Sequence, residues 1–223
     1  MPGCVCSRTH GAGWADLPVR SKICGLTRAE DVRAVAACGA DALGLVFYPN
    51  SPRHVTPPQA AALLRALPPF VSTVGLFVDA DAETVRATLA QVPLDVLQFH
   101  GDESAEFCRQ FGRRYLKAIR VRPGVDLLQC AAHYADAQAL LLDAYVEGVP
   151  GGTGASFDWA LIPRDLPLPV VLSGGLDAGN VAAAVAQVRP YAVDVSSGVE
   201  AAKGIKEAAK IAAFINEVKR ADV

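Results

Sequence analysis

The sequence predicts a single (β/α)₈ barrel, and three observations support this fold class. Eight short apolar runs alternate with eight segments that have helical period. The strand-like runs, such as ALGLVF and ALLLD, are apolar at consecutive positions, as expected for parallel strands buried on both faces. Eight βα units of about 25 residues each also match the roughly 200–250 residues of a closed barrel.

The barrel domain is expected over residues 19–223, after a short extension at residues 1–18. The extension reads MPGCVCSRTHGAGWADLP, which is rich in glycine and small polar residues and has no apolar period. Its Cys4, Cys6 and His10 lack a fourth ligand and a framework for a metal site. We therefore expect residues 1–18 to be a disordered N-terminal extension.

Each strand is expected where a short apolar run occurs between two helical segments. In order, the strands are Ser21–Cys24, Ala42–Tyr48, Thr73–Val78, Val96–His100, Leu116–Val121, Ala139–Asp143, Val170–Ser173 and Ala192–Val195. An open, doubly wound sheet is the alternative arrangement. Such a sheet usually carries a dinucleotide fingerprint after its first strand, where this chain reads KICGLT with one glycine.

Each helix is expected where apolar residues recur at helical spacing between two strands. In order, the helices are Arg28–Cys38, Pro57–Leu67, Ala82–Gln91, Ser104–Phe111, Val125–Tyr134, Phe157–Ile162, Ala178–Val188 and Ile205–Val218. Thr27 with Glu30, and Thr56 with Pro57 and Gln59, have the pattern of capping residues. Two helix starts are therefore predicted at these threonines.

The composition indicates a globular protein of the reducing cytoplasm. Hydrophobic residues make up 52% of the 223 residues, and the net charge of −2 provides no long-range attraction to nucleic acid or an anionic membrane. No apolar stretch reaches the roughly 20 residues that span a bilayer. The six cysteines are too sparse for a disulfide scaffold and lack the spacing of a zinc site. We expect a cytoplasmic location and neither a nucleic-acid nor a membrane partner.

The ends of the last two strands predict a phosphate site. Gly174 and Gly175 follow the seventh strand, and Ser197 and Gly198 follow the eighth. In (β/α)₈ barrels these two loops frequently hold phosphate, because glycines let backbone N–H groups approach its oxygens. Either loop alone could be an ordinary turn. Together they predict a phosphate cup, and hence a small phosphorylated substrate.

Cys24 and Asp143, at the ends of the first and sixth strands, are candidates for proton transfer. Reacting groups collect at this end of the strands, because all the strand ends meet at one mouth. The chemistry needs a carboxylic acid whose pKa is raised by burial and a thiol whose pKa is lowered by nearby positive charge. Lys22 points the same way as Cys24 and is expected to supply that charge. Taken singly, Cys24 could be a buried apolar side chain and Asp143 a helix cap.

Two further features are expected at the same mouth. The loop Ala144–Ser156 contains four glycines and is expected to close over a bound ligand as a lid, the alternative being a surface insertion. Arg53, in the loop after the second strand, offers a permanently charged, fork-shaped donor for a carboxylate or a phosphate. Its alternative is a solvated surface charge.

Eight sequence motifs, in order, resemble the block motifs of the phosphoribosylanthranilate isomerase family over about Val19 to Val218. They are KICGLT, DALGLVFYPNSPRHV, VGLFV, LQFHGDE, LLLDA, GGTGASFDW, VVLSGGLDAGNV and AVDVSSGVE. Two departures are small. QFHG stands where QLHG is commoner, and AAKGIKE stands where a PGxKD-like run is commoner, so that Glu207 replaces an aspartate.

The resemblance implies the Amadori rearrangement of N-(5-phosphoribosyl)anthranilate to 1-(2-carboxyphenylamino)-1-deoxyribulose 5-phosphate in tryptophan biosynthesis, without a metal or an organic cofactor. By analogy, Cys24 of KICG is the general base at C2′ of the ribose, and Asp143 of LLLDA is the general acid at the ring oxygen. Arg53 of SPRHV would meet the anthranilate carboxylate. The remaining expected contacts are Lys22 and His100 to the substrate, and Gly174, Gly175, Ser197 and Gly198 to its phosphate.

Two other functions are compatible with such a barrel. The histidine-pathway barrel isomerase performs the same rearrangement on a related aminoaldose. A resemblance to that enzyme would imply a pair of aspartates instead of a cysteine and an aspartate, so Cys24 argues against it. The other function is that of a non-catalytic barrel that binds a phosphorylated ligand. Such a protein is expected to have lost the general acid or the general base, whereas Cys24 and Asp143 are both present here. The sequence is compatible with a monomer or a homodimer.

Overall fold

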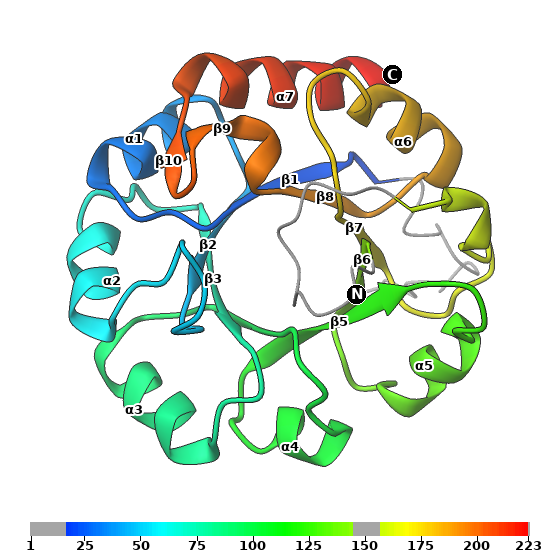
Figure 1. The fold of residues 1–223 in the computed structure, drawn as a ribbon, viewed down its shortest axis with the longest axis horizontal. Coiled ribbons are helices and arrows are strands. Elements are labelled where there is room, and N and C mark those ends of the chain that lie inside the picture. Colours follow the sequence, from blue (N-terminus) through cyan, green and yellow to red (C-terminus); the bar gives the residue numbers. More distant parts are fainter. Residues whose placement is uncertain (1–16, 145–156, 223) are drawn as a thin grey trace, which may run out of the picture.

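The computed structural model describes residues 17–144 and 157–222, and its centre is a closed barrel of eight parallel strands (Figure 1). The strands are β1 (Arg20–Cys24), β2 (Ala42–Val46), β3 (Ser72–Phe77), β4 (Val96–Phe99), β5 (Arg114–Val121), β6 (Ala139–Ala144), β7 (Val170–Leu172) and β8 (Ala192–Val195). Each pairs with the next along the chain, and β8 pairs with β1 to close the barrel. The predicted fold class is confirmed, and every strand lies within two residues of its predicted bounds.

Helices surround the barrel on all sides (Figure 1). Those in the described residues are α1 (Ala29–Ala37), α2 (Pro57–Leu64), α3 (Ala82–Gln91), α4 (Ala105–Arg109), α5 (Leu127–His133), α6 (Val181–Val188) and α7 (Ala208–Ala221). Strand side chains alternate between two faces. Ile23 and Leu43 pack outward into the main core under the helices, whereas Ala118, Leu141 and Val171 form a smaller cluster inside the barrel. With both faces of the strands covered, a ligand can reach the strands only at their ends.

The predicted helix at Phe157–Ile162 is wrong. The structure has a single 3₁₀ turn there, η2 (Trp159–Leu161), which is capped by the side chain of Asp158. Pro163 follows directly, and proline lacks the backbone N–H that a continuing helix needs. The connection from β6 to β7 therefore contains no α-helix among its described residues.

The predicted start of the last helix at Ile205 is also wrong. Residues Ile205–Lys206 form β10, which pairs antiparallel with β9 (Glu200–Ala202), and α7 begins only at Ala208. Gly204 makes the turn between the two short strands with a φ of 78°, a conformation that glycine adopts without strain. This hairpin follows the eighth strand and contacts α1, where the Lys206 N–H donates to Asp31 Oδ2 at 3.2 Å.

Of the two predicted helix caps, one is confirmed. Thr56 and Gln59 form a capping box at the start of α2. The cap at Thr27 is wrong, because α1 begins after Arg28 with no side-chain cap. The Thr27 hydroxyl instead donates to the Gly204 carbonyl oxygen at 2.5 Å, which ties the loop after β1 to the β9–β10 hairpin.

Two predictions fall on parts of the chain that are not described. The N-terminal extension at 1–18 lies outside the described residues except for its last two, and the lid at Ala144–Ser156 lies outside them except for Ala144. Within 17–144 and 157–222, no helix has the length and apolar character to cross a membrane.

Candidate active site

A cavity of about 900 Å³, open to solvent, lies at the carboxyl ends of the strands. The ends of β1, β2, β4, β6, β7 and β8 contribute Cys24, Val46, Gln98, Asp143, Ser173 and Asp194 to its lining. The loop after β2 contributes Tyr48 and residues 50–53. The structure therefore brings residues that are far apart in the sequence to one site.

Cys24 ends β1 and lies against β2. It is 5% exposed, and it is paired in register with Gly44 of β2. A Cβ atom at Gly44 would lie 2.7 Å from the Cys24 Sγ, so only glycine leaves room for the thiol here. The Cys24 carbonyl oxygen accepts a hydrogen bond from the Ser196 hydroxyl at 3.1 Å, which joins the end of β1 to the loop after β8.

Charges of both signs surround the Cys24 thiol. Lys22 is buried two residues earlier and donates to Asp194 Oδ1 at 2.8 Å. Burial raises the pKa of the Cys24 thiol, and the Asp194 carboxylate acts in the same direction, while the positive charges of Lys22 and Lys206 offset part of the effect. The predicted lowering of the Cys24 pKa is therefore wrong. Lys22 does act to lower this pKa, but burial outweighs its effect.

Lys22 lies beneath the cavity, and it is not among the residues that line it. Burial disfavours its charge, but Asp194 and Cys24 together outweigh burial and raise the pKa of Lys22. Lys22 is therefore a buried cation beside Cys24. Its ammonium group is paired with the carboxylate of Asp194, which does line the cavity.

Asp143 ends β6 and takes part in a buried chain of side chains. Its Oδ2 lies 3.1 Å from Nε2 of His100, and Nδ1 of His100 lies 3.0 Å from the Gln98 amide nitrogen. Its Oδ1 accepts the Ala144 N–H at 2.9 Å. Asp143, His100 and Gln98 are all at most 5% exposed and all line the cavity. The predicted residues Asp143 and His100 are thus brought into direct contact across the mouth.

The end of β7 packs tightly against Asp143. Gly174 has a φ of 88°, and a Cβ atom there would lie 2.7 Å from the Ala144 nitrogen and 3.1 Å from Asp143 Oδ1. A side chain at this position would displace the carboxylate. Gly174 therefore supports the position of Asp143 as well as forming part of the predicted phosphate cup.

Three of the four residues of the predicted phosphate cup line the cavity: Gly174, Gly175 and Ser197. Gly198 does not line it. Gly198 lies in η3 (Ser197–Val199), where an added Cβ would overlap the Leu176 carbonyl oxygen, so it packs the loop after β8 against the loop after β7. The structure therefore places the two loops side by side at one end of the cavity.

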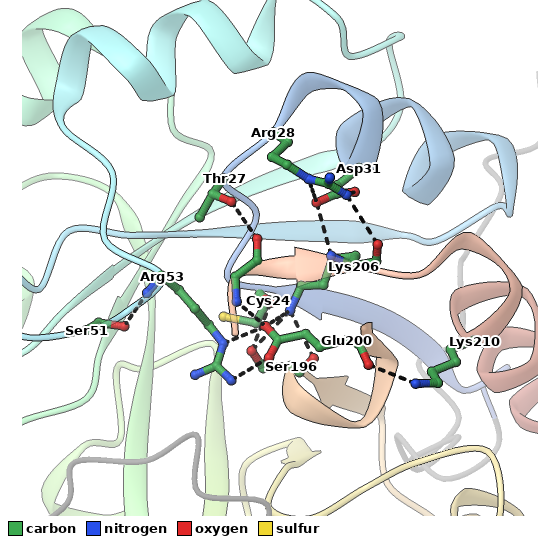
Figure 2. Close-up of polar contacts among 11 residues, drawn as sticks. Cys24, Thr27, Arg28, Asp31, Ser51, Arg53, Ser196, Glu200, Lys206 and Lys210 are labelled. Carbon is green, nitrogen blue, oxygen red and sulfur yellow. Dashed lines mark hydrogen bonds and ion pairs between the residues drawn. The ribbon is translucent and has the colours of Figure 1, made fainter. Parts of the chain in front are cut away.

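Arg53 lines the cavity from the loop after β2, but it is not a solvated surface charge. It is 7% exposed, and its Nε and Nη2 donate to the two carboxylate oxygens of Glu200 at 2.7 and 2.8 Å (Figure 2). Glu200 also accepts from Lys206 Nζ at 2.9 Å. Burial acts to raise the pKa of Glu200, but the hydrogen bonds from Arg53 and Lys206 outweigh it and hold that pKa below its ordinary value.

The sequence analysis did not predict this pairing of Arg53 with Glu200 and Lys206. Arg53 and Glu200 are 147 positions apart in the sequence, and no local pattern links them. Lys206 was included in the helix predicted for Ile205–Val218, so its position in a turn-forming hairpin after Gly204 was missed.

No candidate metal site is found in the described part of the chain, where no three His, Cys, Asp or Glu side chains are grouped in a way that could hold an ion. The groups that line the cavity are instead a thiol, two carboxylates, an imidazole and a guanidinium. Such a set can transfer protons and bind anions.

Comparison with known proteins gives a consistent result. A sequence model of the N-(5′-phosphoribosyl)anthranilate (PRA) isomerase family matches residues 21–217. The N-(5′-phosphoribosyl)anthranilate isomerase of Thiobacillus denitrificans is 64% identical over 203 residues, which cover 91% of this chain and 99% of that protein.

Solved structures agree with this match. The phosphoribosyl anthranilate isomerase of Thermotoga maritima has a TM-score of 0.83 and 42% identity, covering 91% of this chain and 99% of its own. A crystal structure of such an isomerase in complex with reduced 1-(o-carboxyphenylamino)-1-deoxyribulose 5-phosphate has a TM-score of 0.81 and 41% identity, with the same coverage.

Proposed function

The chain belongs to the phosphoribosylanthranilate isomerase family, and from this premise we propose that its barrel mouth rearranges N-(5-phosphoribosyl)anthranilate, with Cys24 as general base and Asp143 as general acid. The observation that carries the proposal is that Cys24, Asp143, Arg53 and both phosphate-cup loops line one cavity. The reaction is a step of tryptophan biosynthesis and yields 1-(2-carboxyphenylamino)-1-deoxyribulose 5-phosphate.

Ring opening is the first step of the proposed mechanism. Asp143 donates a proton to the furanose ring oxygen, and the bond between that oxygen and C1′ breaks to leave an iminium ion between C1′ and the anthranilate nitrogen. The contact between Asp143 Oδ2 and His100 Nε2 keeps the carboxyl oriented at the end of β6. His100 is therefore assigned a role next to the acid and in contact with the substrate.

Proton abstraction is the second step. The Cys24 thiolate removes the proton from C2′, and the electron pair of that C–H bond neutralises the iminium to give an enol with an amino group at C1′. The enol then becomes the ketone as its hydroxyl proton is lost and C1′ gains a proton. Asp143 has given one proton to the former ring oxygen and Cys24 has taken one from C2′, and exchange with solvent restores both groups for the next turnover. Lys22, buried beside Cys24, favours the thiolate by its charge.

Substrate binding is assigned to the two ends of the cavity. The backbone N–H groups of the loops after β7 and β8, around Gly174, Gly175 and Ser197, would hold the phosphate. Gly198 would hold these loops together, because it packs against the carbonyl of Leu176. Arg53 would bind the anthranilate carboxylate by a charge-assisted contact.

The experiment that tests this function is an assay of purified protein with two substrates. We expect the fluorescence of phosphoribosylanthranilate to disappear on addition of the protein, and the histidine-pathway aminoaldose to be consumed far more slowly. Turnover of the second substrate alone would favour the histidine-pathway isomerase. Binding of either compound without turnover would favour the non-catalytic barrel.

The proposal includes a cytoplasmic location and a small phosphorylated substrate as the partner. The location rests on composition, because the six cysteines are sparse and none of the four described cysteines is in a disulfide.

A further inference from the structure

Glu200 lies outside the acid, the base and the phosphate cup, yet it contacts Arg53 more closely than any other described side chain does. It is the first residue of β9, directly after η3, and Arg53 is in the loop after β2 (Figure 2). The two side chains are joined by two hydrogen bonds of 2.7 and 2.8 Å across 147 positions of sequence. A contact of this kind needs an explanation in terms of what Arg53 does.

The geometry of the pair leaves one edge of the guanidinium available. A guanidinium has five N–H donors, and Glu200 takes one on Nε and one on Nη2. The remaining donors include those of the adjacent edge, where Nη1 and the second N–H of Nη2 form another fork of the shape that fits a carboxylate. Among the described residues, no group bonds to Nη1, and Arg53 lines the cavity.

The shaft of Arg53 is also held in place. It crosses Gly25, the residue after Cys24, so closely that a Cβ atom at Gly25 would overlap the Arg53 Cδ atom. Gly25 has a φ of 77°, which favours glycine. Arg53 is thus fixed beside the end of β1, with little side-chain freedom to lose when a ligand binds.

Glu200 is itself fixed by Lys206 and Gly204 from the β9–β10 hairpin. Its Oε1 accepts from Lys206 Nζ at 2.9 Å and from the Gly204 N–H at 3.2 Å. The Lys206 side chain is fully buried, and its Nζ also donates to the Ser196 carbonyl oxygen at 2.9 Å. Two cations share one carboxylate in this cluster, so one positive charge remains uncompensated at the edge of the cavity.

We propose that Glu200 is a positioning residue that holds the Arg53 guanidinium edge-on, so that the free fork of Arg53 meets the carboxylate of the substrate. The proposal rests on the proposed role of Arg53. Lys206 keeps Glu200 in place and keeps the cluster cationic. Glu200 touches Arg53 and not the substrate, so it affects the reaction only through the placement of the guanidinium.

The test is Glu200→Gln, a change that leaves the size of the side chain nearly unaltered. The remaining amide oxygen can still accept from Lys206 and Gly204, but the amide N–H₂ faces Arg53 Nη2, so one bond of the pair is replaced by a repulsion between donors. Glu207→Gln is the matched control, because the half-exposed Glu207 carboxylate pairs only with Lys210 on the surface.

Two ligands distinguish positioning from a general structural effect. One is reduced 1-(o-carboxyphenylamino)-1-deoxyribulose 5-phosphate, and the other is the same compound made with aniline, which lacks the carboxylate. We expect Glu200→Gln to weaken inhibition by the first by roughly tenfold or more. Inhibition by the second, and kcat once the substrate saturates, should change by less than about threefold. Glu207→Gln should change neither inhibition constant.

Arg53→Ala separates failure of this inference from failure of the proposed function. If Arg53→Ala weakens both compounds equally, the proposed role of Arg53 is wrong. If Arg53→Ala discriminates between them and Glu200→Gln does not, Glu200 has no positioning role. The double variant should bind no more weakly than Arg53→Ala alone, and additive losses would overturn the proposal. Should Glu200→Gln not fold, Glu200→Asp carries the same test, because it keeps the charge for Lys206 and withdraws the carboxylate from Arg53 by one methylene.

Discussion

At the scale of single residues, the thiol of the proposed general base, Cys24, lies in an environment that favours its protonated form. Cys24 is buried against Gly44, and burial raises the pKa of its thiol despite the neighbouring Lys22 and Lys206. A general base must be deprotonated before it can accept a proton. In the free enzyme, the reactive thiolate is therefore the minor form at neutral pH.

This environment predicts the pH dependence of activity. We expect the limb of the kcat/KM profile that reports the ionisation of Cys24 to lie above the ordinary thiol pKa of about 8.5, since the pKa of Cys24 is shifted upward. Cys24→Ser should lower kcat by at least about 10²-fold and abolish that limb of the profile, while Cys38→Ser, a half-buried cysteine away from the cavity, should change neither. A limb that persists in Cys24→Ser would assign the base to another group.

Asp143 is the second residue on which the proposed mechanism depends. Asp143→Asn keeps the side-chain size and a polar contact to His100, but it removes the acidic proton, so we expect kcat to fall by about 10²–10⁴ without loss of the fold. Asp81→Asn is a suitable control, because asparagine also caps helices and Asp81, which caps α3, does not line the cavity. Near-normal turnover by Asp143→Asn would remove Asp143 from its role as general acid.

At the scale of elements, the two loops after β7 and β8 act as one unit. Gly198 of η3 packs directly on the carbonyl of Leu176, and the Asn180 side chain at the start of α6 donates to the Gly175 carbonyl at 2.8 Å. These contacts hold both glycine-containing loops against the same end of the cavity. A change in their separation should therefore affect phosphate binding before it affects the barrel.

Gly198→Ala tests this arrangement. The added methyl would overlap the Leu176 carbonyl oxygen and push the two loops apart, so we expect KM to rise at least about tenfold and competitive inhibition by inorganic phosphate to weaken in parallel. Gly179→Ala, where a Cβ would meet only Asp177 Oδ1 at 3.2 Å, should have a much smaller effect. Unchanged inhibition by phosphate in Gly198→Ala would place the phosphate at another part of the cavity.

At the scale of the whole molecule, the two ends of the barrel sequence meet. The Val19 N–H donates to Asp222 Oδ2 at 2.9 Å, and β1 then pairs with β8 to close the sheet. The family match covers residues 21–217, which is nearly the same span. The eight strands and the described residues that line the cavity thus lie within residues 18–222.

Removal of residues 1–17 should therefore leave folding and activity nearly unchanged. The truncated chain keeps Pro18, whose carbonyl accepts from Arg20, and keeps the Val19 contact to Asp222. We expect the melting temperature to change by less than about 3 °C, which corresponds to less than about 1 kcal/mol for a protein of this size, with kcat and KM unaltered. A much larger drop in a thermal melt, with the full-length protein as control, would show that the extension contributes to the fold.

Patterns that are local in the chain were sufficient to predict most of the architecture. Apolar runs and helical periods each extend over a few residues, and eight consecutive βα units of this length are typical of a closed barrel. The errors occurred where a local pattern competed with a distant partner. Residues 205–206 fit the period of the last helix, but they pair with β9 instead, and Thr27 bonds to Gly204 rather than capping α1.

The sequence by itself determined the barrel, the placement of Cys24 and Asp143 at strand ends, and the family resemblance, because each of these depends on residue type and spacing along the chain. Only the tertiary structure decided that Arg53 is held by Glu200 and that burial raises the pKa of the Cys24 thiol. Both depend on groups brought together by barrel closure. No spacing rule in the chain relates residues 53 and 200, and desolvation is set by everything packed around an atom.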